Sequence, residues 1–563
     1  MMGFTPTPES VAARYQRGVS FNNGIDLYDT VSTNEDFFVG KQWEGVKSNG
    51  LPTPVFNFLK RVVLFSVANV STDNLKLHAN PMPSSSGVDK QTLETLSSIL
   101  NDQFLALFES NKMGAVIREF CRNAAVDGDG CTFSWFDPDE ETGQDAKGIV
   151  RTEVLKNTQV LFGNPNNRDV QSQPYLIIER RMMVSEARKR ARRYSADEAD
   201  TESIIADESE GENSHMDELG GDKVTVLVYL WKDDETGHVH SYECTKSVEL
   251  RADTDLGISL YPVTWMPWDF VHDCYHGQAM ITGLIPNQIF VNKLFAMSMI
   301  SLMTLAYPKI IYDKTKVAKW SNRVGAQIAV NGSVDNVAKI IDPASISPQI
   351  SQFIELAISY TQKFLGATDV ALGDTRPDNT SAIIALQRAA ATPMELTKQA
   401  LLQSIEDLGR IYIAFMGEYY GTRYVEIPTP FGGQKEIISF DFSALRNIPC
   451  SVKLDVGASS YWSEIAEMQT LDNLLMQNKI STVEYLKRIP AGQITDRETL
   501  IAVLEEQERM EKAMAGIPVP DAGAQQASVP GATDEAEPPV RGGPGYGALQ
   551  RKINQTGEVP KEG

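Results

Sequence analysis

The spacing of apolar residues changes period several times along this chain, and this limits the folds open to it. Between Lys90 and Ala125 apolar residues recur every three or four positions, which predicts a helical stretch. A DGDG turn follows, and Cys131–Gly143 with Ile149–Leu155 then alternate as the two strands of a β-hairpin do. Stretches with helical spacing and stretches with strand-like spacing continue to alternate along the sequence to about residue 510. The sequence therefore predicts an α+β protein that is mostly helical.

Further stretches repeat one pattern or the other. The stretches with helical spacing are Phe58–Asn69, about 277–306, a segment opened by Ser347 and Pro348, and a very long helix from 382 to about 420. The stretches with strand-like spacing are Pro174–Val184, Val224–Trp231 and His238–Cys244, and we expect the last two to pair as a second hairpin. Pro393 is expected to kink the long helix. Two capping boxes, Ser481 with Glu484 and Thr495 with Glu498, predict terminal helices.

The charge balance excludes one class of function. The chain has 52 Lys and Arg against 74 Asp and Glu, a net charge of −22. Proteins that coat nucleic acid rely on many Lys and Arg contacts to phosphate, so any contact with DNA is expected to be loose. Eleven acidic residues and no Lys or Arg lie between Ser195 and Asp222. Like charges at this density repel one another, which predicts an exposed insertion.

The sequence indicates neither secretion nor membrane insertion. The N-terminus has no basic segment followed by an apolar one, as a secretory signal has. The longest uncharged part of the most apolar stretch, Leu294 to Lys309, falls short of the roughly 20 residues of a membrane span. A buried or subunit-facing helix is therefore favoured there, with a membrane pore as the weaker alternative. Five widely spaced cysteines without a CxxC motif fit a reducing cytoplasm.

Motifs of common enzymes are missing, and one metal candidate is present. GxxxxGK[ST], HExxH and GxSxG do not occur. In HDCYH, a strand would place His272, Cys274 and His276 on one face, but no fourth ligand is evident. We favour a polar connector and no cofactor, and we keep a cytoplasmic metal-dependent enzyme as the alternative. A second cluster, equally consistent with a solvated surface or a weak phosphate-facing patch, contains Lys309, Lys314, Lys316, Lys319 and Arg323.

The order of three stretches resembles the portal (head-to-tail connector) proteins of tailed double-stranded DNA bacteriophages. The first is FFVGKQW followed by PVFNFLKRVV, and the second is Phe162–Val184. The third runs from His276–Ser301 through YPKIIYDK and a second helix to LGDTRPDNTSAIIALQRAAATPMEL and the long helix. The likeness covers about residues 30 to 510. It implies a ring of about twelve subunits at one capsid vertex, with DNA passing through the axis during packaging and ejection.

On this resemblance the chain divides into portal parts. We expect a flexible N-terminal arm (1–29), a wing (30–265), a stem helix (277–305), a clip (306–347), a second stem helix (348–367), a tunnel loop (373–381), a long wing helix (382–421), a strand-rich wing segment (422–459), crown-like helices (460–515) and a disordered tail (516–563). The acidic insertion 195–222 matches no part of the family.

The resemblance also implies sites and partners for a protein that is not an enzyme. The tunnel-loop residues expected at the DNA channel are Asp374, Arg376, Asp378 and Asn379. The clip residues expected to guide DNA are Lys314, Lys316, Lys319 and Arg323, and the expected subunit contacts are Leu294, Met299 and Leu302. The implied partners are double-stranded DNA, the packaging ATPase (terminase large subunit), major capsid and scaffolding proteins, and a head–tail adaptor. Such a protein is assembled in the host cytoplasm, becomes part of the virion and meets no membrane.

Overall fold

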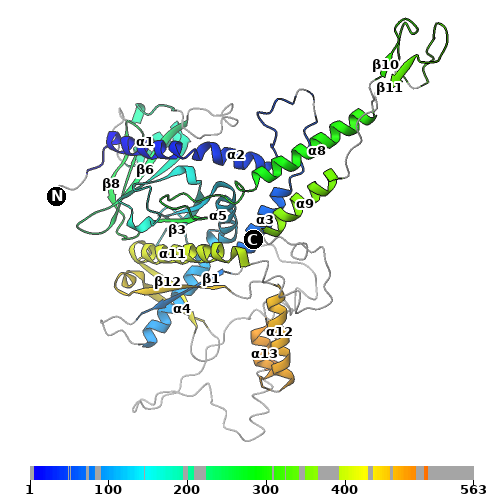
Figure 1. Cartoon of the computed structure of the whole chain (residues 1–563). Helices are drawn as coiled ribbons and strands as arrows, with labels where there is room; N and C mark the ends of the chain where they lie inside the picture. The colour runs from blue at the N-terminus through cyan, green and yellow to red at the C-terminus, as the bar shows by residue number, and fades with distance from the viewer. Residues whose placement is uncertain are drawn as a thin grey trace, which may run out of the picture. The chain divides into compact units, whose positions relative to one another are not determined.

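The computed structural model of the chain is shown in Figure 1. It describes residues 5–48, 50, 52–71, 75–82, 90–144, 146–194, 201–207, 223–306, 310–321, 323, 325–340, 349–364, 392–428, 435–456, 461–477, 479–489, 500–501 and 503–504. Residues 1–495 form one compact unit and residues 496–563 a second. All elements described below belong to the first unit.

Two helices open the chain, α1 (Pro8–Gly24) and α2 (Leu27–Val39). Thr7 and Ser10 form a reciprocal capping box, and Pro8 occupies the first helical position, so the start of α1 is well specified. One face of α1, including Val11, is buried in an apolar cluster with residues of the neighbouring sheet. The expected flexible arm is therefore wrong for this segment, because its apolar residues recur at helical spacing and find a partner.

The predicted helical stretch from Lys90 to Ala125 is two helices. These are α4 (Lys90–Ser110) and α5 (Met113–Asp127). Between them Lys112 adopts a left-handed backbone conformation with φ of 51°, which ends the first helix. The helix predicted around Phe58–Asn69 is confirmed as α3 (Phe58–Val70), which contacts α5.

Two antiparallel sheets follow the helices. A three-stranded sheet has the order β3-β2-β9, formed by Ile149–Leu155, Asp129–Asp137 and Val263–Pro267. A five-stranded sheet has the order β4-β5-β6-β7-β8, formed by Val160–Phe162, Tyr175–Met183, Lys223–Lys232, Val239–Cys244 and Glu249–Asp255. Both predicted hairpins are confirmed, with Trp135 opposite Arg151 and Trp231 opposite His240. A short helix, α6 (Val184–Arg193), contacts β5, β6 and β8.

A long helix, α11 (Glu395–Tyr419), contributes many side chains to the largest apolar core. Its buried residues include Leu401, Ile405, Leu408, Tyr412 and Phe415, which recur at the helical spacing seen in the sequence. Pro393 lies in a 3₁₀ turn, Thr392–Met394, from which α11 continues. Residues 382–391 of the predicted helix lie outside the described residues.

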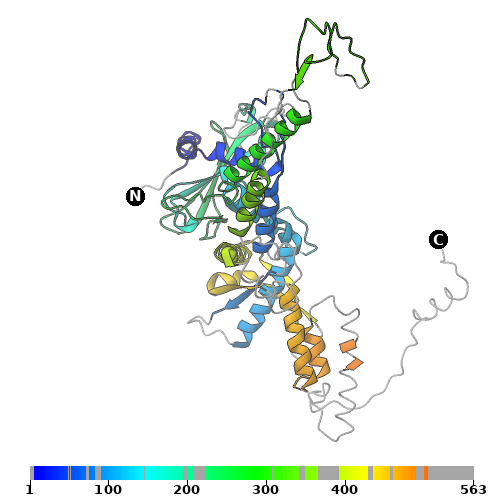
Figure 2. The ribbon, with the colours of Figure 1, turned by 45° about the vertical axis from the view of Figure 1, so that its right-hand side comes forward.

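Two further helices enclose a small hairpin in the sequence. They are α8 (Ile285–Ala306) and α9 (Gln349–Phe364), and the hairpin pairs β10 (Ile310–Tyr312) with β11 (Ala338–Ile340). The two helices lie side by side in both views (Figure 1, Figure 2). The predicted start at 277 is wrong, because Gln278 instead bridges Asp269 and the chain turns before Ile285.

The last part of the first unit returns to strands and then to helices. The hairpin β12–β13 (Thr422–Pro428 and Lys435–Asp441) precedes a 3₁₀ turn, Phe442–Asn447. Strand β14 (Cys450–Val456) pairs with β1 (Leu75–Pro81), which joins segments far apart in the sequence. The helices α12 (Tyr461–Met476) and α13 (Thr482–Arg488) follow, and Ser481 caps α13 as predicted. The second capping box, at Thr495, lies outside the described residues.

Candidate functional site

The first half of α8 is held inside the chain by polar side chains. The Gln288 side chain is fully buried, accepts from the Leu59 backbone N–H at 3.3 Å and donates to the Phe56 carbonyl at 2.8 Å. One turn later, Asn292 donates to Gln42 Oε1 at 2.7 Å. These polar residues interrupt the apolar stretch in the sequence, and the structure gives them partners within the fold.

The two helices α8 and α9 pack on each other in antiparallel directions. Near one end Asn287 Nδ2 donates to Thr361 Oγ1 at 3.1 Å, and farther along α8 Leu294 packs with Ile354 in a small apolar cluster. Leu294 is buried in this cluster, so it belongs to the packing within one chain. Leu294 therefore has little exposed apolar surface for the subunit contact that the sequence predicts.

Other large apolar side chains of the pair are exposed. We call them the exposed α8–α9 face: Phe290, Met297, Met299, Leu302, Met303, Phe353, Leu356 and Tyr360. Met299 is 39% exposed and Leu302 is 54% exposed, so two of the three predicted interface residues belong to this face. Large exposed apolar side chains that gather on one pair of helices are typical of a contact with another molecule. Among the described residues, no helix has the length and apolar character needed to cross a membrane.

The predicted clip cations lie at the surface of the β10–β11 segment. Lys314, Lys319 and Arg323 are exposed, and Lys316 is partly buried and donates to the Asp335 carbonyl at 3.2 Å. This segment has its own small packing, in which Val317 is buried and the rings of Tyr312 and Trp320 stack with centroids 5.5 Å apart. The cations are thus carried by a folded surface segment.

The HDCYH residues do not converge as a metal site requires. They lie in a turn rather than on a strand, and Asp273 has a left-handed backbone with φ of 56°. The His272 side chain is 86% exposed whereas that of His276 is 3% exposed. In the part of the chain that the structure describes, no group of three or more His, Cys, Asp or Glu residues is arranged to hold a metal. The geometry does not support the metal-enzyme alternative.

His276 instead belongs to a buried polar network at the start of the segment leading to α8. Its Nδ1 lies 2.8 Å from Asp129 Oδ2, and its Nε2 lies 3.2 Å from Asn22 Oδ1. The other Asp129 oxygen accepts from the Gly277 backbone N–H at 2.7 Å. Gly128 and Gly277 meet closely, since a Cβ on Gly128 would lie 2.8 Å from the Gly277 carbonyl oxygen. The sequence predicts the DGDG turn but gives no sign of this distant pairing.

A second buried ionic cluster lies at the end of α5. Arg122 forms a bidentate ion pair with Glu35 of α2, and Asp127 lies next to both. Burial and the nearby charge of Glu35 raise the pKa of the Asp127 carboxyl to about 8, although Arg122 partly opposes them. The neighbouring Asn34 donates to the Val126 carbonyl at 2.9 Å and to Thr282 Oγ1 at 2.9 Å. The end of α5 is thereby tied to the segment before α8.

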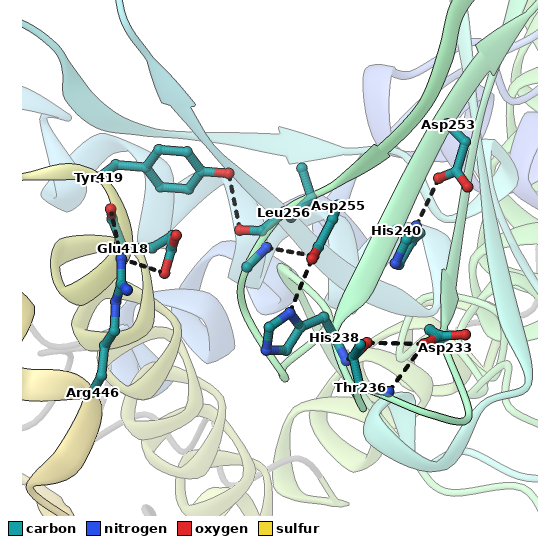
Figure 3. Close-up of polar contacts among 11 residues, drawn as sticks. Asp233, Thr236, His238, His240, Asp253, Asp255, Leu256, Glu418, Tyr419 and Arg446 are labelled. Atoms are coloured by element: carbon teal, nitrogen blue, oxygen red, sulfur yellow. Dashed lines mark hydrogen bonds and ion pairs between the residues drawn. The ribbon is translucent and has the colours of Figure 1, made fainter.

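Polar contacts also join the end of α11 to the loop after β8 and to the 3₁₀ turn Phe442–Asn447 (Figure 3). Tyr419 donates its hydroxyl to the Leu256 carbonyl at 2.9 Å, and Arg446 pairs with Glu418 at 2.8 Å. In the same view His238 Nδ1 lies 3.0 Å from Asp255 Oδ2. Burial alone would raise the pKa of Asp255, but hydrogen bonds from His238 and the Gly257 backbone N–H outweigh burial and lower it.

Of two other predicted features, the tunnel loop lies outside the described residues and the acidic insertion is described only in part. Asp374, Arg376, Asp378 and Asn379 lie outside the described residues. Of the acidic insertion, residues 201–207 are described, and here the predicted exposure is wrong at Thr201 and Ile204, which are buried. Arg188 of α6 donates to the Ile204 carbonyl at 2.9 Å, and Arg181 pairs with Asp207 at 2.6 Å. Basic residues that precede the insertion hold this part against the sheet.

Comparison with known proteins identifies the family of this chain. The chain matches the family model of the phage P22-like portal proteins over residues 25–441. A search of curated proteins finds no match. Portal proteins are head-to-tail connectors of bacteriophages that serve DNA packaging, and they form oligomeric rings in the capsid that contact DNA and terminase. Since the match covers well over half of the sequence, this chain belongs to the phage P22-like portal protein family.

Proposed function

We propose that about twelve copies of this chain close into a ring at one capsid vertex and that DNA crosses the ring during packaging and ejection. The observation that carries the proposal is the exposed α8–α9 face. A single subunit leaves Met297, Leu302, Met303 and their neighbours in water. Burying one such side chain contributes roughly 1.5–3 kcal/mol, so contact with the next subunit would stabilise a ring.

The portal parts then correspond to segments of this chain. The stem would comprise α8 and α9, with the clip at 306–347 between them. The wing would comprise 30–265, the long helix 382–421 and the strand-rich segment 422–459. The tunnel loop would be 373–381 and the crown-like helices 460–515. The α8–α9 packing and the small folded hairpin between these helices support this assignment.

The charge of the chain fits a channel through which DNA slides. With −22 on each chain, a ring would repel phosphate overall and avoid tight binding. A few cations would still centre the moving duplex, and our candidates are Arg376 in the tunnel loop with Lys314, Lys316, Lys319 and Arg323 in the clip. The exposure of three of the clip cations supports this role.

The partners follow from the same arrangement. The sequence has no GxxxxGK[ST] motif, so we assign ATP hydrolysis to a packaging ATPase that docks on the clip. A head–tail adaptor would take its place after packaging, while capsid and scaffolding proteins would contact the wing. The subunits would assemble in the host cytoplasm before they become part of the virion.

Native mass measurement and negative-stain imaging of the purified chain test the ring. A twelve-membered ring has a mass of roughly 746 kDa, twelve times 62.2 kDa, and an axial hole. A chain that stays monomeric even when co-expressed with its capsid and scaffolding proteins would refute the proposal.

Deleting Asp374–Thr380 tests the channel, because we expect rings to form but DNA packaging or retention to fall. Unchanged genome filling would contradict the role of the loop.

A further inference from the structure

The loop between β10 and β11 (Figure 1) contains an Asn-Gly pair, Asn331 and Gly332. Both residues are exposed, and Gly332 has a left-handed backbone with φ of 100°. A Cβ on Gly332 would meet no heavy atom within 4 Å, so the main chain is open to approach there. Because glycine has no Cβ, nothing shields its backbone nitrogen from the side chain of the preceding asparagine. This loop therefore presents a candidate site of covalent modification.

The two groups that would react make no hydrogen bonds that hold them apart. Among the described residues, the Gly332 N–H has no acceptor and the Asn331 carboxamide has no partner. The Asn331 backbone N–H donates to the Lys316 carbonyl at 2.9 Å. This bond fixes the main chain on one side of the pair and leaves the Asn331 side chain free to rotate toward the Gly332 nitrogen.

We propose that Asn331 is a site of spontaneous deamidation. The Gly332 backbone nitrogen loses its proton to water or hydroxide and attacks Cγ of Asn331. A bond forms between this nitrogen and Cγ, the bond from Cγ to the side-chain nitrogen breaks, and the leaving group takes a proton from water and departs as ammonia. Water then opens the resulting cyclic imide. Cleavage at Cγ gives aspartate, and cleavage at the backbone carbonyl carbon gives isoaspartate, so the net reaction consumes one water and releases one ammonia.

A second asparagine of the same loop provides the comparison. Asn336 is also exposed, and its side chain has no hydrogen bond among the residues that the structure describes. It is followed by Val337 rather than by glycine. The branched valine side chain lies beside the nitrogen that would have to attack and is restricted in its rotation, so it hinders ring closure. The reaction is therefore expected at Asn331 and not at Asn336.

The backbone also sets Asn331 apart from another Asn-Gly pair of the chain. Asn23 and Gly24 end the helix α1. The Gly24 N–H belongs to the hydrogen-bonding pattern of the helix, in which each N–H donates to the carbonyl four residues earlier. A nitrogen engaged in this way is a poor nucleophile. Of the third pair, Asn49 lies outside the described residues.

Conversion adds one negative charge to a segment that carries cations. Residues 310–340 have five Lys and Arg against two Asp. Both products have a free carboxyl group, which is ionised at neutral pH. On the proposed function, this charge weakens the attraction of the clip cations for DNA phosphate. That consequence rests on the proposed function, whereas the reaction itself depends only on the loop.

Ageing of the purified full chain tests the proposal. The chain is kept at mildly alkaline pH and physiological temperature and digested rapidly with trypsin. The tryptic peptide 324–339, which contains both Asn331 and Asn336, is then sequenced by mass spectrometry. We expect the amide of Asn331 to be replaced by a carboxyl group about tenfold faster, or more, than that of Asn336. No conversion at Asn331, or equal rates at the two positions, would overturn the proposal.

A matched pair of variants assigns the reaction. Asn331→Gln keeps a carboxamide but requires a larger ring for the same attack, so we expect the conversion at this position to be lost. Asn336→Gln makes the same change elsewhere in the loop and is expected to leave the rate at Asn331 unchanged within about twofold. Both positions are exposed, so neither change should disturb folding. Persistent conversion of Asn331→Gln at the parent rate would refute the assignment.

Discussion

The core around α11 and the exposed α8–α9 face are both rich in large apolar side chains, but these side chains are buried in the core and exposed on the face. Leu401, Leu408 and Tyr412 of α11 are each 2% exposed or less. Met299 and Leu302 of α8 are 39% and 54% exposed. A helical run of apolar residues therefore forms a core within the chain in one place and, in the other, an exposed surface that we propose another subunit covers.

The largest expected effect is at the junction that leads to α8. His276→Ala leaves the buried Asp129 carboxyl without its imidazole partner, so the free energy of unfolding of the subunit should fall by about 3 kcal/mol. Urea unfolding followed by tryptophan fluorescence measures it. The control His272→Ala, at an exposed side chain, should change this free energy by less than about 0.5 kcal/mol. Equal losses in the two variants would show that the network contributes nothing.

Truncation in the α11 core tests the first side of the comparison. Leu408→Ala should lower the free energy of unfolding of the subunit by about 2–3 kcal/mol, because it removes buried methyl groups and leaves a cavity. Leu302→Ala, on the exposed α8–α9 face, should lower it by less than about 0.5 kcal/mol under conditions that keep subunits apart. If Leu302→Ala were as costly as Leu408→Ala, Leu302 would be buried within the subunit.

The buried carboxyl of Asp127 gives the region before α8 a pH dependence. Its pKa is raised in the folded chain from 3.8 to about 8, so the folded state holds the proton more tightly. The contribution of this group is therefore present at low pH and is lost as the pH rises through the folded pKa. Relative to the wild-type chain, Asp127→Asn should gain stability progressively as the pH rises from 5 to 8, as urea unfolding at several pH values would measure. Parallel stability curves for the two proteins would contradict this.

The smallest effect on the subunit is expected at the exposed face. Met299→Asp should change the unfolding free energy of the single subunit by less than about 0.5 kcal/mol but prevent ring formation, because it places a charge in the contact between subunits. Leu294→Asp should impair both, since Leu294 also packs against α9 within the chain. Native mass spectrometry and thermal unfolding separate the two outcomes. Rings from Met299→Asp would exclude this position from the interface.

Local patterns explain how much of the fold could be predicted. The β2–β3 and β6–β7 hairpins were predictable because strict alternation and turn residues are local signals. The break at Lys112 was not, since neither Gly nor Pro marks it and only the packing of α4 and α5 requires the turn. The α1 helix was missed although Val11, Tyr15 and Val19 recur at helical spacing, because these few apolar residues stand in a mostly polar sequence and their burial depends on the neighbouring sheet.

The site was predictable in kind but not in its contacts. The apolar run of α8 indicates a buried or subunit-facing helix, yet nothing in it tells that Leu294 faces α9 while Met299 stays exposed. His276 stood out as a metal candidate from its neighbours in sequence. Its actual partner, Asp129, is 147 positions away, and such a pairing depends on tertiary packing alone.

The central claim, that neighbouring subunits cover the exposed α8–α9 face, is tested most directly by photo-crosslinking from position 299. A benzophenone side chain introduced there should link two chains in the assembled protein, and the covalent dimer is detected on a denaturing gel. A label at Asp273, in the exposed turn before His276, serves as the comparison. We predict an intermolecular product from position 299 in rings and none under conditions that separate the subunits. Rings that form without any product from position 299 would contradict the account.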